Sequence, residues 1–279
     1  MNCRHCGEKL QVPFVDLGVA PPSNAYLTEN ALKSPEKWFP LRVLVCTNCW
    51  LVQTEDYVGA EELFSADYAY FSSYSDTWLG HSKLYVQKMI ERFGLNPSSF
   101  VIEVASNDGY LLQYVKAQNI PCLGIEPTMS TALAARAKGI DTIEDFFGVR
   151  LAKNLASQGK YADLMIANNV LAHVPDINDF IQGFAILLKE GGIATFEFPH
   201  LLRLVEEAQF DTIYHEHYSC LSLTAAKRIF EANGLSIFDV EELSTHGGSL
   251  RVYSERQDSA LREKSPSVER LLKRERKLV

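Results

Sequence analysis

The sequence predicts an α/β fold with a mostly parallel sheet, preceded by a small N-terminal module. Between residues 100 and 198, short apolar runs typical of buried strands alternate with stretches of helical spacing. This alternation indicates right-handed crossovers and helices on both faces of the sheet. The first apolar run breaks into a short polar loop at 105–109. Because ligands bind beyond the carboxyl ends of strands in open α/β sheets, this loop marks the expected ligand site.

The composition is that of a globular protein and predicts that the chain neither binds nucleic acid nor spans a membrane. The chain has 279 residues, 47% of them hydrophobic and 22% charged, and a formal net charge of −8. A negative protein is poorly suited to neutralising nucleic-acid phosphates. No apolar run approaches the roughly 18 to 20 residues that span a bilayer, and the first residues lack the apolar stretch of a secretory signal. These features predict a cytoplasmic protein.

Residues 1–75 are expected to form a small module held together by a metal ion. Prolines and glycines are frequent there, and two Cys-x-x-Cys pairs lie beside turn-forming residues. In a reducing compartment this pattern favours a tetrahedral zinc site over disulfides. The predicted zinc ligands are Cys3, Cys6, Cys46 and Cys49. The pairs lie farther apart than in a compact zinc ribbon, so buried or disulfide-linked cysteines remain the alternative, and His5 is expected at the surface.

An aromatic, hydroxyl-rich linker at 67–75 follows the module and carries Tyr68, Tyr70 and Tyr74. One interpretation is a linker whose rings cover apolar surface while the phenols reach water. The other is a lid that supplies a phenol to a cleft. The sequence leaves both open.

The main domain is expected over residues 76–257. Its first helix covers 76–93 and ends at Gly94. Strands are expected at 100–105, 122–125, 141–143, 162–167 and 193–198. Helices separate them at about 109–118, 128–138, 148–157 and 177–189.

After Pro199 the pattern changes. A helix is expected at 222–233, and two closely spaced runs at 236–242 and 249–254 predict antiparallel strands at one edge of the sheet. Residues 258–279 are expected to form a charged connecting helix with an apolar seam. The seam consists of Val268, Leu271, Leu272 and Leu278. Because such a seam needs a partner surface, a dimer or a further domain is expected to pack on the last helix.

The loop after the first strand favours an adenosyl ligand without a pyrophosphate. A dinucleotide site requires Gly-x-Gly-x-x-Gly so that the backbone approaches the pyrophosphate, whereas Ala105-Ser-Asn-Asp-Gly109 has one glycine. Glu126 follows by about 20 residues, the separation at which an acidic side chain reaches ribose hydroxyls. Asp145 and Phe146 would place a carboxylate and a phenyl ring near adenine. The segment 167–176 adds amides and a histidine beside the same cleft.

The chain resembles a class I S-adenosylmethionine (SAM) methyltransferase in three segments, Val101-Ile-Glu-Val-Ala-Ser-Asn-Asp-Gly109, Gly124-Ile-Glu-Pro127 and Ala167-Asn-Asn-Val-Leu-Ala-His-Val-Pro-Asp176. Three further features narrow the class to one family: the double Cys-x-x-Cys module, Tyr214-His-Glu-His217 and His246-Gly-Gly-Ser-Leu-Arg-Val-Tyr253. Together they resemble the zinc-containing sugar C-methyltransferases, which act on nucleotide-linked keto-deoxysugars. The resemblance covers nearly the whole chain.

This resemblance implies a structural zinc ion on the four cysteines, SAM as cofactor and a nucleotide-linked keto sugar as substrate. The residues expected to hold SAM are Ala105, Asn107, Gly109, Glu126, Phe146 and Asn169. It also implies a histidine of the Tyr-His-Glu-His segment as general base, by position His217. Tyr214 and Glu216 would be its neighbours in the cleft, and Tyr68 would supply a phenol.

The chemistry suits such a base, because carbon becomes a nucleophile when a proton is removed next to a carbonyl. A 4-keto sugar offers this proton at C3, and a neutral imidazole with a pKa near 6.5 suits its removal. The enolate would then take the methyl group, with its oxygen stabilised by a donor such as a phenol.

Other roles stay open for the histidines. In an extended segment, His215 and His217 would share one face and a metal, whereas in a turn one of them alone need enter the cleft. A structural hydrogen-bonding role for His217 is a third interpretation. His173 is expected to pack or cap the loop over SAM, with direct catalysis as the alternative.

Two other functions also stay open, an O- or N-methyltransferase and a non-catalytic zinc- and SAM-binding module that docks through 258–279. Members of the resembled family continue into a further C-terminal domain beside the sugar cleft. We therefore expect the zinc and SAM sites to be intact and the sugar site to be incomplete in this chain.

Overall fold

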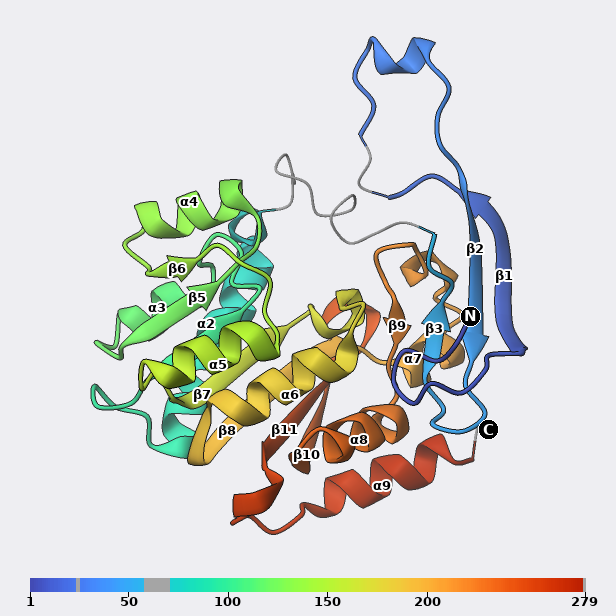
Figure 1. Ribbon diagram of the computed structural model, residues 1–279. Helices are drawn as coiled ribbons and strands as arrows, with labels where there is room; N and C mark the ends of the chain where they lie inside the picture. Colours follow the sequence, from blue (N-terminus) through green and yellow to red (C-terminus); the bar gives the residue numbers. More distant parts are fainter. Residues whose placement is uncertain (24–25, 58–70, 278–279) are drawn as a thin grey trace.

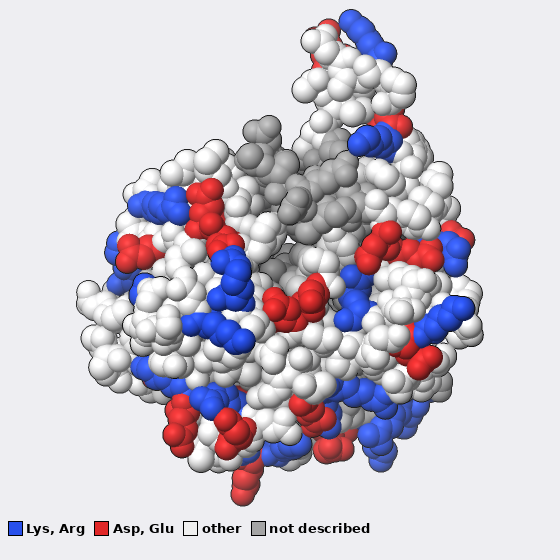
Figure 2. All heavy atoms as spheres, viewed as in Figure 1, with Lys and Arg blue, Asp and Glu red and all other residues white. Residues whose placement is uncertain are grey.

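Two β-sheets and their flanking helices make up the structure, a computed structural model that describes residues 1–23, 26–57 and 71–277. Helices cover the larger sheet, and the smaller sheet lies beside it at the N-terminal end of the chain (Figure 1). On the face shown in Figure 2, basic and acidic side chains of the described residues are interspersed. None of the helices in the described ranges combines the length and apolarity needed to cross a membrane.

The larger sheet has the strand order β10-β11-β8-β7-β4-β5-β6. Its strands are β4 (Val101–Val104), β5 (Cys122–Ile125), β6 (Thr142–Ile143), β7 (Ala162–Asn168), β8 (Leu188–Pro199), β10 (Leu235–Leu243) and β11 (Ser249–Arg256). The pairs from β6 across to β8 are parallel, and β11 pairs antiparallel with both β8 and β10. The predicted parallel sheet with an antiparallel pair at one edge is therefore confirmed.

The helices follow the predicted order, but two of them are shorter than expected. The last helix covers Pro266–Glu275 rather than 258–279, because a proline is favoured at the first turn of a helix and Pro266 starts it there. They are α2 (Asp76–Phe93), α3 (Leu112–Lys116), α4 (Met129–Ala137), α5 (Val149–Ser157), α6 (Ile177–Leu187), α7 (Leu201–Glu206), α8 (Leu223–Ala232) and α9 (Pro266–Glu275). Short 3-10 turns are η1 (Ala31–Lys33), η2 (Ser72–Tyr74), η3 (Leu171–His173), η4 (Phe210–Thr212), η5 (Thr245–Gly247) and η6 (Gln257–Ser259). α3 begins later than expected, because Asn107 and Gly109 have φ values of 49° and 76°, which a right-handed helix does not admit.

The core between sheet and helices is built from apolar strands and aromatic rings. β4 and β7 are buried along nearly their whole length, as parallel strands covered on both faces require. Phe196 of β8 packs against Phe184 of α6 and Phe230 of α8, with ring centroids 4.6 and 4.7 Å away. These contacts hold the sheet rigid beneath its carboxyl edge.

The smaller sheet has the order β1-β2-β3-β9 and is antiparallel throughout. Three of its strands come from the N-terminal module, β1 (Val12–Ala20), β2 (Phe39–Val45) and β3 (Val52–Thr54). The fourth, β9 (Ser219–Cys220), comes from the main domain directly after the Tyr-His-Glu-His segment. The module is thus joined to the main domain by strand pairing.

The seam of the last helix is covered by the chain itself, so the inference that it needs a partner surface from a dimer or a further domain was wrong. α9 packs against α8 and β10, and Val268, Leu271 and Leu272 are all buried there. Leu278 lies outside the described residues. Because the chain folds back over α8 after η6, the buried seam gives no support to a dimer or a further domain on this helix.

Glu275 fastens α9 to the start of α8. Its carboxylate accepts hydrogen bonds from the backbone N–H groups of Leu223 and Thr224 (2.7 and 2.8 Å) and contacts Nε2 of His200 at 2.8 Å. A carboxylate at a helix N-terminus also interacts favourably with the helix dipole. Burial alone would raise the pKa of Glu275, but the hydrogen bonds from His200 and Thr224 outweigh it and lower the pKa.

Replacing Glu275 with Gln should lower the free energy of unfolding by about 1.5–3 kcal/mol, because charge-assisted hydrogen bonds to buried donors are lost. Urea denaturation followed by circular dichroism measures the change. Glu269→Gln, on the exposed face of the same helix, is the matched control and should change stability by less than about 0.5 kcal/mol. Equal effects of the two substitutions would contradict the capping role.

Candidate active site

A cavity of about 880 Å³ lies at the carboxyl ends of β4, β5 and β7. Its walls come from the loop after β4, the ends of β5 and β6, the loop after β7 and the segment around 211–217. Ser23 of the N-terminal module and His246 of η5 also line it. Ligand pockets usually measure roughly 300–1,000 Å³, so this cavity is large enough for a sizeable ligand.

The elbow, defined as Ala105–Gly109, turns the chain sharply at the cavity wall. Ala105, Asn107 and Gly109 all have left-handed backbones, with φ values of 57°, 49° and 76°. A Cβ atom at Gly109 would lie 2.4 Å from Cδ1 of Ile140, and the left-handed φ would strain any larger residue there. Left-handed non-glycine residues carry strain that is typical of ligand-binding loops. The side-chain Oδ1 of Asn107 accepts the N–H of Ser72 at 2.9 Å, which docks η2 on the elbow.

Glu126 is held in a fixed orientation at the end of β5. One carboxylate oxygen accepts the N–H of Asn107 and the other accepts the N–H of Thr128, both at 2.9 Å. Burial raises the pKa of Glu126, and the two backbone donors offset part of this effect. The carboxylate lines the cavity, where it could accept hydrogen bonds from ribose hydroxyls.

The other walls of this half of the cavity offer unpaired amides and an aromatic face. Oδ1 and Nδ2 of Asn168 and Oδ1 of Asn169 are buried without a hydrogen-bond partner among the described residues. Buried unpaired amides are costly unless a ligand satisfies them. Phe146 lines the rim and is half exposed. A carboxylate, an aromatic ring and amides are the groups that suit ribose, adenine and the amino-acid end of SAM.

The segment Tyr214-His-Glu-His217 forms a turn, since the N–H of His217 donates to the carbonyl of Tyr214 at 2.9 Å. Tyr214, Glu216 and His217 line the cavity, whereas His215 contacts the carbonyl of Pro40 through Nε2 at 3.1 Å. The two histidines therefore point to different surroundings, and the turn leaves no basis for a metal shared between them.

His217 is a buried, neutral imidazole with a defined tautomer. Its Nδ1–H donates to the carbonyl of Thr212 at 2.7 Å, and its Nε2 accepts the hydroxyl of Tyr214 at 2.8 Å. A carbonyl oxygen can only accept a hydrogen bond. The ring proton of His217 therefore lies on Nδ1 and the lone pair on Nε2. Burial, with a smaller contribution from neighbouring His173, lowers the pKa of His217 to about 3.

His173 supports the same turn from the loop after β7. Its Nδ1–H donates to the carbonyl of Glu216 at 2.9 Å, and its ring centroid lies 4.6 Å from that of His217. Burial lowers the pKa of His173 to about 4. The carboxylate of Glu216 accepts the hydroxyl of Ser23 at 3.0 Å, so the N-terminal module also contacts the turn.

The four predicted zinc ligands meet at one point of the N-terminal module. The Sγ atoms of Cys3, Cys6, Cys46 and Cys49 all lie within 4.8 Å of one another. Tetrahedral coordination at about 2.3 Å places sulfur atoms about 3.8 Å apart, so this cluster fits a zinc ion. Nε2 of Gln53 donates to Sγ of Cys3 at 3.2 Å, as hydrogen-bond donors around a thiolate site commonly do. His5 is not part of this cluster, and its Nδ1 lies 2.8 Å from Oδ1 of Asn178.

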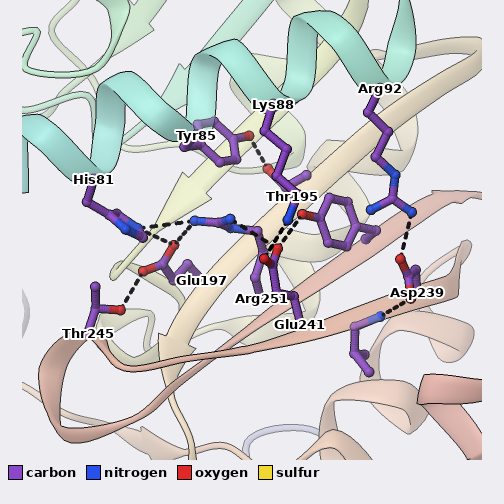
Figure 3. Close-up of polar contacts among 12 residues, drawn as sticks. His81, Tyr85, Lys88, Arg92, Thr195, Glu197, Asp239, Glu241, Thr245 and Arg251 are labelled. Carbon is purple, nitrogen blue, oxygen red and sulfur yellow. Dashed lines mark hydrogen bonds and ion pairs between the residues drawn. The ribbon is translucent and has the colours of Figure 1, made fainter.

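A buried ionic network centred on Glu197 and Arg251 contacts η5 through Thr245 (Figure 3). Glu197 of β8 accepts hydrogen bonds from Arg251 (2.6 Å) and Thr245 (3.0 Å) and lies 3.1 Å from Nε2 of His81. Burial alone would raise the pKa of Glu197, but His81 and the charge of Arg251 outweigh it and lower the pKa. The network fixes η5 and thereby His246, which lines the cavity with a left-handed φ of 51°.

Most predicted site residues meet in this cavity, but the sequence did not indicate several of their supports. Ala105, Asn107, Glu126, Phe146, Asn169, Tyr214, Glu216 and His217 line it, and Gly109 lies in the elbow behind it. Tyr68 lies outside the described residues. Trp78, Thr212 and Glu197 were missed, because they act through ring contacts, a backbone carbonyl and a buried ion pair, none of which leaves a local pattern.

Two family models match this chain, one for each part of the structure. A family model described as "Putative zinc binding domain" matches residues 3–64, and one described as "Methyltransferase domain" matches residues 78–240. The chain belongs to the methyltransferase-domain family. The expected methyltransferase domain and N-terminal zinc-binding module therefore correspond to these two family models.

Individual proteins agree with this assignment. The C-methyltransferase NovU of Streptomyces niveus is 32% identical over 275 residues, and the match covers 99% of this chain and 65% of that protein. The PH0226 protein from Pyrococcus horikoshii OT3 has a TM-score of 0.55 at 13% identity, over 70% of this chain and 100% of that chain. Magnesium protoporphyrin IX methyltransferase (ChlM) from Synechocystis PCC 6803 with bound SAH has a TM-score of 0.51 at 16% identity, over 64% of this chain and 83% of that chain. The two structures confirm the class I methyltransferase fold.

Replacing Glu126 with Gln should weaken SAM binding by about 10- to 100-fold, because a charged acceptor is lost and one backbone N–H of the elbow loses its partner. Isothermal titration calorimetry with SAM measures the change. Glu144→Gln, just beyond the neighbouring strand β6, is the matched control and should bind SAM as the unmodified protein does. Unchanged affinity in the Glu126 variant would contradict the ribose-binding role.

Stability should fall as the pH drops from about 6.5 toward 4, because His173 and His217 are held neutral in the folded chain. Their pKa values are lowered on folding, so the unfolded chain binds more protons in this window. The stability is therefore fully present above the unfolded pKa, and each histidine contributes a slope of up to about 1.4 kcal/mol per pH unit below it.

Urea denaturation at pH 7, 6 and 5 measures this slope. The double variant His173→Asn, His217→Asn should show a flatter dependence than the unmodified protein, whereas His5→Asn should retain the original slope. An unchanged slope in the double variant would show that these two histidines are not the groups being protonated.

Proposed function

We propose that this chain forms the SAM-binding and base-carrying part of a SAM-dependent C-methyltransferase. The substrate is a nucleotide-linked keto-deoxysugar, which is methylated at the carbon next to its ketone. The observation that carries this proposal is the placement of His217 and Tyr214 in the same cavity as Glu126 and the elbow. The name of the relative NovU, a C-methyltransferase, supports carbon as the methylated atom.

SAM supplies the methyl group when bound, and the elbow half of the cavity holds it. Glu126 accepts the ribose hydroxyls, and Phe146 covers the adenine at the rim. Asn168 and Asn169, whose amide atoms lack protein partners among the described residues, bind its amino-acid end. This half leaves the region around 211–217 for the sugar.

His217 removes the proton next to the ketone through Nε2. The bond from Nδ1–H to the carbonyl of Thr212 keeps the lone pair on Nε2 and orients the ring. In the structure Tyr214 occupies this lone pair at 2.8 Å, so the substrate must displace the phenol. The displaced hydroxyl then donates to the ketone oxygen, where negative charge develops.

The low pKa of His217 is consistent with this role once the substrate is considered. Burial lowers the pKa to about 3, which favours the neutral, proton-accepting form at every physiological pH. A developing enolate beside the ring favours the imidazolium and raises the pKa again. Proton transfer is therefore coupled to formation of the enolate rather than to the pH of the solvent.

His217→Asn should still bind SAM but lose both methyl transfer and exchange of the C3 proton with deuterated solvent. Nuclear magnetic resonance of a panel of nucleotide-linked keto sugars follows the exchange, and calorimetry follows SAM binding. We expect the exchange rate to fall at least about 100-fold, the usual magnitude for loss of a general base.

His215→Asn provides the matched control, because His215 is equally part of the turn but lies outside the cavity lining. This variant should retain exchange even where its stability is reduced. Exchange that persists in the His217 variant would refute the base assignment, and methylation without any exchange would indicate an O- or N-methyltransferase.

A further inference from the structure

We propose that Arg4 is a positioning residue that couples the zinc site to the catalytic turn. Arg4 lies between the zinc ligands Cys3 and Cys6, and its side chain is 6% exposed. The proposal rests on the proposed function, because it concerns the placement of His217. It assigns the metal module a role in the geometry of the cavity in addition to holding its own fold.

The zinc site fixes the backbone from which Arg4 projects. The N–H of Arg4 donates to Oε1 of Gln53 at 3.0 Å, and Nε2 of the same Gln53 donates to Sγ of Cys3 at 3.2 Å. Gln53 is fully buried in β3. Gln53 therefore joins the Cys3–Cys6 segment to β3, the strand that pairs with β9.

The guanidinium of Arg4 then contacts segments that are distant in sequence. Nη2 donates to the carbonyl of Thr54 at 2.9 Å and to Oδ1 of Asp56 at 2.8 Å. Nη1 donates to the carbonyl of Pro175 at 3.3 Å, and the group lies over the ring of Tyr218 at 5.1 Å. One side chain thus joins the end of β3, the loop after β7 and the residue that follows His217.

Two of these contacts lead directly to the proposed base. The hydroxyl of Thr54 donates to the backbone carbonyl of His217 at 2.7 Å, and the N–H of Thr54 donates to the carbonyl of Tyr218 at 3.1 Å. Pro175 lies two residues after His173, whose ring holds the carbonyl of Glu216. The hydrogen bonds that Thr54 and His173 make to the turn therefore start from segments that Arg4 contacts.

Arginine is suited to this task because its planar guanidinium presents several donors in a fixed arrangement and also stacks on aromatic rings. Lysine has a single flexible ammonium group and cannot reproduce the arrangement. A shift of about 1 Å in the base is enough to lower turnover by about 100-fold. Loss of Arg4 should therefore lower turnover while SAM still binds on the opposite side of the cavity.

The test uses the full zinc-loaded chain with Arg4→Met, Arg4→Lys and Thr54→Val. Arg262→Met is the matched control, because Arg262 also donates to a backbone carbonyl (Gly191, 3.0 Å) and a carboxylate (Glu255, 2.7 Å) and lies over Phe238 at 5.3 Å. None of these contacts involves a residue of the cavity lining. Zinc content and SAM affinity are measured first. C3 exchange of a nucleotide-linked keto sugar and the kcat and KM of methyl transfer are then measured, together with the proton–nitrogen signals of the His217 ring.

We expect Arg4→Met to retain zinc and to keep SAM affinity within about 3-fold, while kcat falls about 10- to 100-fold with little change in KM. The Nδ1–H signal of His217 should shift or exchange faster with water. Arg4→Lys should resemble Arg4→Met, and Thr54→Val should show the same changes to a smaller degree. Arg262→Met should lower stability but leave kcat and the His217 signals unchanged.

The proposal is overturned if folded, zinc-loaded Arg4→Met keeps the kcat and the His217 signals of the unmodified protein. It is also overturned if Arg262→Met lowers kcat as strongly, because the loss would then follow stability alone. The His217 signals need no substrate, so they test positioning even where the His217→Asn variant retains exchange and the proposed function itself fails.

Discussion

The pairing of β3 with β9 is the contact on which the arrangement of the cavity depends. Two residue pairs, Val52 with Cys220 and Gln53 with Ser219, join the metal module to the main domain. β9 begins two residues after His217, so its register determines the depth at which the turn enters the cavity. A slip of one residue would turn the side chains of this short strand to the opposite face. The metal module therefore acts as part of the cavity wall.

Burial penalises the charged form of every ionisable group around the cavity, and these groups respond in two different ways. Glu197 keeps its charge because His81 and Arg251 compensate for burial, so a buried anion holds Thr245 of η5 beside His246. His173 and His217 give up their charge, and backbone carbonyls fix the proton on Nδ1 in each ring. Buried charges that are paired confer rigidity, whereas buried neutral imidazoles remain able to accept a proton. The first arrangement suits a scaffold and the second suits a reacting group.

The sequence predicted the larger sheet, and it predicted that the elbow and Glu126 lie together in a cavity, because both depend on short-range patterns. The elbow and Glu126 lie 19 residues apart, and one βαβ unit brings them together whatever the rest of the chain does. The four cysteines were also predictable, since thiolate pairs at this spacing carry their own chemistry. The apolar seam of α9 was misjudged because periodicity shows that a face is apolar but not which surface covers it.

The half of the cavity around Tyr214–His217 could not be assembled from the sequence for the same physical reason. Its turn is placed by Ser23, Thr54 and His173, which come from three separate segments. No local pattern records a hydroxyl that meets a carbonyl 163 residues away, as that of Thr54 meets His217. The two halves should accordingly differ in how they respond to the metal. The half around the elbow and Glu126 is built on the larger sheet, so it should keep its geometry without the metal, whereas the half that carries the proposed base should lose its geometry when the cysteine cluster no longer holds β3 and Arg4 in place.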